Sequence, residues 1–159
     1  MGRNGALTLT YERKGGPSVY FYGTFEHAMD DRGRIAVPAV YRRAFSEGGV
    51  VRPSVEGCVE LYAPDAFQAE VERRLSGDDQ STRTQSARRS RRGFLAEAFP
   101  VELDRQGRIL LPPPIRAAAA IDGRAVIIGC GDYLELWDAV RWQQEQAAIA
   151  AAESEELAR

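Results

Sequence analysis

A ten-residue segment occurs twice in this chain, and this internal repeat constrains the fold more than any other feature. Residues 29–38 read MDDRGRIAVP and residues 103–112 read LDRQGRILLP. Five of the ten positions are identical, whereas ordinary composition would give about one match. The identical pairs are Asp30/Asp104, Gly33/Gly107, Arg34/Arg108, Ile35/Ile109 and Pro38/Pro112. The sequence therefore predicts two copies of one small structural unit.

Each copy predicts the same order of elements. Residues 23–29 and 98–103 have the alternation and aromatic content of a strand. Each is followed by an Asp-x-x-Gly sequence typical of a tight turn whose glycine takes a positive φ. The other predicted strands are 35–37, 50–55, 58–62, 109–111, 124–130 and 133–137, and the predicted helices are 39–45, 65–75, 87–97, 113–120 and a long one capped by Asp138. The fold class expected is α+β and rich in strands.

The size of the repeat bears on assembly. A unit of roughly 55–65 residues is near the lower limit for independent folding, and short hairpins leave strand edges unpaired. We therefore expect the two copies to pair with each other, and neighbouring chains to complete the packing.

Composition excludes several classes of function. The sequence holds one histidine, His27, and two cysteines, Cys58 and Cys130, with no CxxC pair, P-loop or G-x-G-x-x-G motif. These residues support neither a nucleophile–base pair nor a metal cluster, so we expect no enzyme, no cofactor and no metal. We interpret the cysteines as small buried apolar residues of strands. No stretch reaches the 18 or so apolar residues of a membrane span, and the N-terminus lacks the apolar core of a secretory signal.

The charge is unevenly distributed. The formal net charge of −2 argues weakly against DNA binding. However, 20 of the 21 basic residues are arginine, which binds phosphate and guanine better than lysine does. Arginines cluster in residues 80–93, which contain no acid, and acids collect at the C-terminus. A basic surface can therefore exist on a chain whose total charge is slightly negative.

At this point the motifs resemble a known family. The segments YGTFEHAMDDRGRIAVPAVYRR, FPVELDRQGRILLPPPIR and LELWD closely resemble MraZ proteins, over about residues 21–145. The resemblance implies two AbrB-type swapped-hairpin β-barrel units with flanking helices, assembling into a ring. The boundaries expected are an N-terminal extension (1–20, disordered), a first repeat (21–76), a polar loop and basic linker helix (77–97), a second repeat (98–142) and a C-terminal helix (143–159).

The resemblance also implies a function. It implies a sequence-specific regulator of transcription, acting mostly as a repressor, that binds double-stranded DNA at short, repeated G-rich sites before the division and cell-wall genes. It further implies a homo-oligomer in the cytoplasm, associated with the nucleoid, with no membrane and no small-molecule substrate. The family's D-x-x-x-R motif corresponds here to Asp30/Arg34 and Asp104/Arg108.

The candidate DNA-binding residues are Arg32, Arg34, Arg105 and Arg108, which lie on or beside the turns. A β-ribbon can enter the major groove, where arginine binds guanine O6 and N7. Alternatively, Asp30–Arg34 and Asp104–Arg108 are ion pairs that brace turns made possible by Gly33 and Gly107. This alternative is the stronger one for Arg34 and Arg108, and DNA reading is favoured for Arg32 and Arg105 at the turn tips. Both roles can coexist.

The arginine cluster has two interpretations as well. On a helix, Arg88, Arg89, Arg91 and Arg92 are candidates for sequence-independent phosphate contacts. They could equally pair with acids of an adjacent subunit or remain solvated. Two other functions stay open: an antitoxin-like member of the AbrB superfamily, and a scaffold ring that does not bind DNA.

Overall fold

The computed structural model describes residues 9–13, 16–75 and 84–159. Its elements follow the order that the repeat predicts, with boundaries shifted by one or two residues in most cases. They are β1 (Leu9–Arg13), β2 (Gly16–Tyr20), β3 (Thr24–Ala28), β4 (Arg34–Ala36), the 3₁₀ helix η1 (Ala39–Phe45), β5 (Gly49–Pro53), β6 (Val59–Tyr62), α1 (Pro64–Leu75), α2 (Gln85–Leu95), β7 (Phe99–Val101), β8 (Arg108–Leu110), α3 (Pro113–Ala119), β9 (Arg124–Gly129), β10 (Leu134–Asp138) and α4 (Ala139–Leu157).

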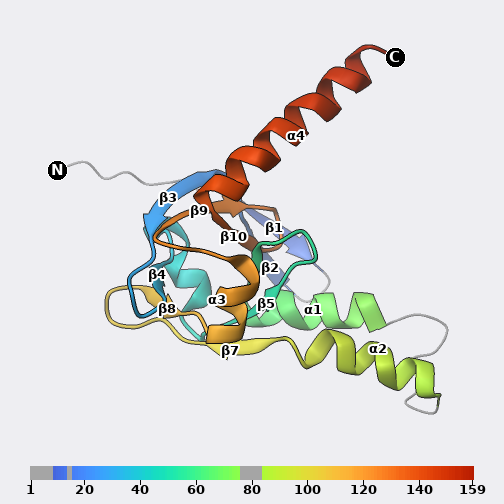
Figure 1. The fold of residues 1–159 in the computed structure, drawn as a ribbon. Coiled ribbons are helices and arrows are strands. Elements are labelled where there is room, and N and C mark those ends of the chain that lie inside the picture. The colour runs from blue at the N-terminus through green and yellow to red at the C-terminus, as the bar shows by residue number, and fades with distance from the viewer. Residues whose placement is uncertain (1–8, 14–15, 76–83) are drawn as a thin grey trace.

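The two repeats share one six-stranded sheet with the order β3-β9-β10-β6-β5-β7 (Figure 1). The first repeat's β3 pairs with the second repeat's β9, and the second repeat's β7 pairs with the first repeat's β5, both antiparallel. In the middle, β10 pairs with β6, which again joins the two repeats. The expectation that the copies pair is therefore confirmed, and they do so by exchanging strands across one sheet.

The strands that follow the two turns also pair across the repeats. β4 and β8 form a separate antiparallel two-stranded sheet centred on Ile35 and Ile109. Alternating side chains of the large sheet face this pair, η1 and α3, and bury the core. Its largest fully buried members include Phe21, Ile35, Phe45, Leu61, Ile109, Leu111, Ile115, Ile127, Leu134 and Leu136. Because this pairing is antiparallel, the turns before β4 and β8 lie at opposite ends of the two-stranded sheet, each beside the end of the other repeat's strand.

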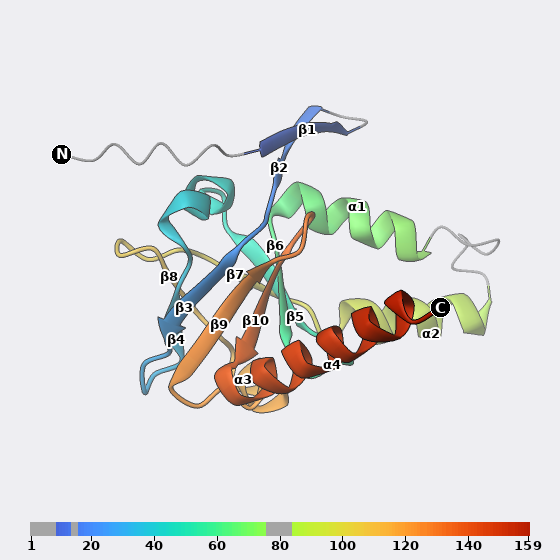
Figure 2. The same cartoon turned by 90° about the horizontal axis from the view of Figure 1, so that it is seen from above.

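Helices α1 and α2 lie away from these turns. α1 and α2 run beside each other on the side of the molecule opposite β4 and β8, as Figures 1 and 2 both show. α2 is capped by Thr84, whose side chain accepts a hydrogen bond from the Ala87 amide. α4 is capped by Asp138, as predicted, and its C-terminal end points away from the sheet and from α2 (Figure 1).

A buried arginine attaches the helix pair to the sheet. Arg52 of β5 is 7% exposed, and its Nη1 donates a hydrogen bond to Oε1 of Glu60 at 3.2 Å. Its guanidinium lies 4.4 Å from the centre of the Phe94 ring of α2. The Phe94 ring stacks on Phe67 of α1, with 5.9 Å between ring centres. The guanidinium of Arg52 therefore joins α2 to the sheet, and the stack of Phe94 on Phe67 joins α2 to α1.

Two differences from the sequence predictions concern local structure. Residues 39–45 form a 3₁₀ helix, in which the basic Arg42 and Arg43 lie in the last turn. Residues 1–20 were expected to be disordered, yet Leu9–Arg13 and Gly16–Tyr20 form an antiparallel hairpin. The threonine, valine and tyrosine residues of this stretch favour strands, and glycine content alone does not cancel that preference. Of the predicted loop and linker at 77–97, residues 77–83 lie outside the described part of the chain.

The two cysteines and the histidine lie in or beside strands of the large sheet. Cys58 is buried just before β6 and Cys130 is half-buried after β9, and burial raises the pKa of both thiols, that of Cys130 to about 12. His27 lies in β3, as expected. Within the described residues, no helix is both long and apolar enough to span a membrane.

Candidate nucleic-acid interface

The first turn is organised by the carboxylate of Asp30. Its Oδ1 accepts hydrogen bonds from the backbone amides of Arg32 and Arg34, at 3.0 and 2.8 Å. Its Oδ2 accepts from Nε of Arg34 at 2.6 Å. Gly33 closes the turn with φ of +83°, a conformation that side chains disfavour. The predicted contact between the aspartate and the arginine four residues later is therefore present here.

The second turn repeats this arrangement. Oδ1 of Asp104 accepts from the amides of Gln106 and Arg108, both at 2.9 Å, and Oδ2 accepts from Nε of Arg108 at 2.9 Å. Gly107 has φ of +75°. Hydrogen bonds from the backbone amides of Arg34 and Arg108 are the main cause that lowers the pKa of Asp30 and Asp104, respectively. Both aspartates are therefore anionic at neutral pH, and each forms an ion pair with the arginine four residues later.

The two turns, residues 30–34 and 104–108, form a single unit that we call the paired turns. The Val37 amide donates to the Gly107 carbonyl, and the Leu111 amide donates to the Gly33 carbonyl, each at 2.9 Å. Nη1 of Arg108 also lies 3.7 Å from Oδ2 of Asp30, so an ion pair crosses from one repeat to the other. The fold thus places each motif beside the end of the strand that follows the other motif, and the Arg108 side chain links the two turns.

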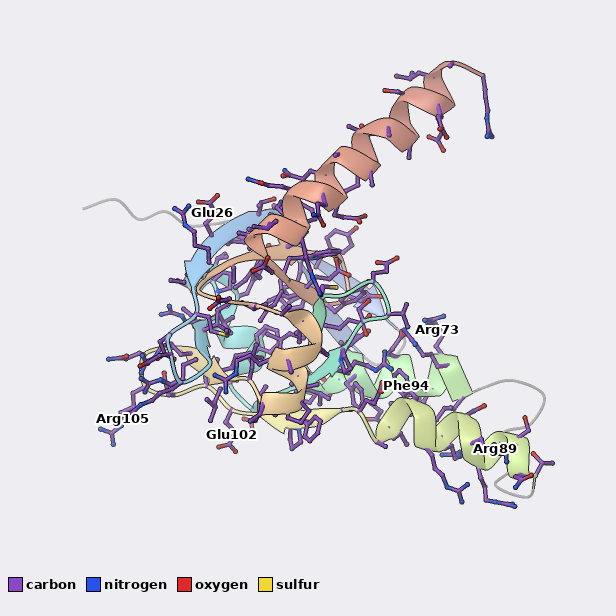
Figure 3. All side chains as sticks on the ribbon, viewed as in Figure 1. Glu26, Arg73, Arg89, Phe94, Glu102 and Arg105 are labelled. Atoms are coloured by element: carbon purple, nitrogen blue, oxygen red, sulfur yellow. The ribbon has the colours of Figure 1, made fainter. Side chains whose placement is uncertain are left out.

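The tip residues remain available to a partner. Arg32 and Arg105 are exposed, and no carboxylate of the described residues lies within ion-pair distance of either side chain. Arg105 extends into solvent at the end of the molecule in Figure 3. By contrast, Arg34 and Arg108 are half-buried and engaged with aspartates. The paired turns therefore combine two braced arginines with two free ones.

The structure adds two arginines to which the sequence analysis assigned no role. Arg42 of η1 lies against Gly107, and Arg116 of α3 lies against Gly33, so each repeat contacts the turn of the other. An ideal Cβ on Gly107 would be 2.6 Å from Cζ of Arg42, and one on Gly33 would be 2.6 Å from Nη1 of Arg116. The sequence does hold a sign of their role, because Arg42 and Arg116 occupy equivalent positions in the two repeats.

The structure separates the other predicted arginines from this site. Arg88, Arg89, Arg91 and Arg92 all lie on α2. Arg89 and Arg105 are at opposite ends of the molecule in Figure 3. A duplex bound at the paired turns of one subunit therefore lies away from the α2 arginines of that same subunit.

Replacing Asp30 and Asp104 by asparagine is expected to destabilise the fold and to flatten its response to acid. Folding lowers the pKa of both carboxyls below their ordinary value of 3.8. Their contribution to the free energy of unfolding is therefore complete above that ordinary pKa, and it is lost as the pH falls through the lower pKa of the folded protein. The wild type should therefore lose melting temperature between about pH 5 and pH 2 more steeply than the variant. Thermal unfolding followed across this range checks the prediction, with Asp65→Asn in the exposed first turn of α1 as control. Parallel acid profiles would contradict it.

Comparisons with known proteins agree with this architecture. The family model described as "MraZ protein, putative antitoxin-like" matches residues 20–89 and 94–159, which include both repeats. A protein of Thermomicrobium roseum named Transcriptional regulator MraZ is 43% identical over 138 residues, covering 87% of this chain and 94% of the relative. Proteins of the same name from Lactiplantibacillus plantarum and Nocardioides sp. are 36% and 37% identical over 131 residues, covering 82% of this chain and 91% and 89% of their own.

The likeness thus spans both turn motifs, the strands exchanged between the repeats and the C-terminal helix. A family model that matches nearly the whole chain, together with relatives at this level of identity, leaves one assignment: this chain belongs to the MraZ family.

Proposed function

We propose that this protein is a transcriptional regulator that binds double-stranded DNA through its paired turns, as an oligomeric ring on short repeated G-rich promoter sites. It acts chiefly as a repressor of its own division and cell-wall gene cluster. The name shared by its relatives, Transcriptional regulator MraZ, supports the regulatory role. The observation that carries the DNA contact is that Arg32 and Arg105, at the tips of the paired turns, are exposed and make no ion pair with the described residues.

The geometry suits a double helix in two respects. A two-stranded β element fits the major groove, and an arginine at its tip can donate two hydrogen bonds to guanine. The turns are pre-organised by their aspartates, so little side-chain and backbone entropy remains to be lost on binding. Two copies per chain, multiplied by the subunits of a ring, let weak single contacts on repeated sites add up to a stable complex.

A footprint on the protein's own upstream DNA, at two salt concentrations, tests this function. Protection of regularly spaced short repeats that weakens steeply with salt is expected, because several phosphates would be engaged. Equal affinity for the promoter and for unrelated DNA would refute sequence-specific regulation. A small protein that co-purifies with the chain and abolishes its DNA binding would favour the antitoxin-like alternative.

Two charged helices support assembly by a head-to-tail contact. The outer half of α4 exposes Glu153, Glu155 and Glu156, together with Ile149 and Leu157. On the other side of the molecule, α2 exposes Arg89 and Arg92. One end of the chain is therefore complementary in charge to the other end of a second copy. Such heterologous contacts generate closed rings when the rotation between subunits closes.

Reversing the charge of the α4 end is expected to shift the oligomer toward smaller species. In Glu153→Lys/Glu155→Lys/Glu156→Lys, attraction to α2 of the next subunit becomes repulsion, because each replaced pair changes sign. Sedimentation velocity at several protein concentrations measures the effect. Adding Arg89→Glu and Arg92→Glu to this variant should restore the larger species, and Glu102→Lys, exposed elsewhere, should leave the oligomer unchanged. An unaltered oligomer in the α4 variant at all concentrations would exclude this contact.

A further inference from the structure

Two guanidinium groups at the paired turns are not used by the Asp–Arg contacts. Arg42 and Arg116 are half-buried, and each lies directly against the glycine of the opposite turn. Nε of Arg42 also donates to the Val37 carbonyl oxygen at 3.0 Å, which fixes the plane of the group. The guanidinium of Arg42 is therefore oriented by a hydrogen bond, whereas that of Arg116 is placed beside its turn by its contact with Gly33.

Neither charge is neutralised within the described part of the chain. The carboxylates of the two turns, Asp30 and Asp104, are engaged with Arg34 and Arg108. No other carboxylate among the described residues lies within ion-pair distance of Arg42 or Arg116, and the Arg116 side chain makes no hydrogen bond to any described residue. A guanidinium has five N–H donors, so most of these donors remain for a ligand. Two fixed, uncompensated cations flank the exposed tips.

We propose that Arg42 and Arg116 each bind a phosphate of the DNA backbone beside the base edges reached by the turn tips. This inference rests on the proposed function, because it takes the paired turns as the DNA-binding site. Phosphate is the ligand that fits, since a planar guanidinium binds two phosphate oxygens at once. Arg42 and Arg116 are set back from the exposed tips, and a group in that position meets the backbone that borders the groove before it meets a base.

The arrangement also couples the two repeats during binding. Arg42 comes from the first repeat but lies against the second turn, and Arg116 comes from the second repeat but lies against the first turn. A base contact and its neighbouring phosphate contact are therefore made by different repeats. A duplex bound at one turn would thus be held by both halves of the chain.

The test is the salt dependence of DNA binding by Arg42→Gln/Arg116→Gln. Losing two phosphate contacts should reduce the slope of log K against log salt by about 1.8, and should weaken binding to target and unrelated DNA alike. Arg42→Lys/Arg116→Lys retains the charge and should keep the wild-type slope. The matched control Arg43→Gln/Arg124→Gln removes two exposed arginines and should also keep it.

The outcomes separate this inference from the proposed function. If the wild type shows no preference for its promoter, the proposed function fails. If the wild type is specific and the glutamine variant keeps the wild-type slope, even with a lower melting temperature, the two arginines only brace the turns and the inference is overturned. Should the double variant fail to fold, Arg116→Gln alone, which gives up no hydrogen bond within the described residues, carries the test, with an expected reduction of about 0.9.

Discussion

The double variant Arg32→Ala/Arg105→Ala is expected to lose specific DNA binding while keeping its fold and its oligomeric state. A bidentate contact between arginine and guanine contributes about 1–3 kcal/mol of discrimination, so two such contacts correspond to a loss of roughly 30-fold to more than 1,000-fold. Both side chains are exposed and make no ion pair with the described residues, so their removal should cost little stability. Band-shift titrations on promoter and unrelated DNA measure the loss.

A control variant that loses the same number of positive charges distinguishes specific contacts with bases from general electrostatic attraction to DNA. Arg73→Ala/Arg159→Ala removes two exposed arginines outside the paired turns and should weaken both DNAs only slightly. Normal binding of the promoter by Arg32→Ala/Arg105→Ala would show that the turn tips are not the readers. The half-buried Arg34 and Arg108 would then become the candidates, since the aspartates already orient them.

The largest effect on stability is expected from Arg52→Ala. This change leaves Glu60, which is 6% exposed, without its cation, and it removes the charged group that lies over the Phe94 ring. Breaking one side of a buried ion pair typically costs about 3–5 kcal/mol, because the remaining charge is buried without compensation. For a chain of this size that corresponds to a loss of roughly 10 °C or more in melting temperature.

The neighbourhood of Glu60 makes this variant more severe than a simple loss of contact. Glu60 faces Glu135 directly across the β6–β10 pair, so removal of Arg52 leaves two carboxylates close together. Adding Glu60→Gln should recover part of the stability, because it removes the buried charge that Arg52 compensates. Thermal melts of the single and double variants check this point, and a loss with no recovery would mean that lost packing on Phe94 dominates.

How far the sequence could predict this structure depends on the range of the interactions involved. The Asp-x-x-Gly-Arg turns, the strands around them and the Asp138 cap are local features, set by residues a few positions apart. Their predicted positions agree closely with the structure. The N-terminal hairpin is an exception, since the glycine and charge content of this stretch indicates disorder whereas its threonine, valine and tyrosine residues favour strands.

Long-range pairing could not be predicted in the same way. The strand pattern of β3 is compatible with a partner in its own repeat or in the other one, since both repeats present similar alternating strands. The structure pairs β3 with β9 and β7 with β5, so each repeat completes the sheet of the other. The contacts of Arg42 with Gly107 and of Arg116 with Gly33 follow from this exchange, and no spacing within one repeat predicts them.

The sequence by itself therefore determined the repeat, its elements, the Asp–Arg contact within each turn and the resemblance to the MraZ family. The tertiary structure alone decided that the two turns are joined through the antiparallel β4–β8 pair, that the α2 arginines lie at the opposite end of the molecule, and that two further arginines cross between the repeats. The physical reason is that turns and caps depend on neighbouring residues, whereas strand exchange depends on which sheet edges and apolar faces meet when the whole core is buried.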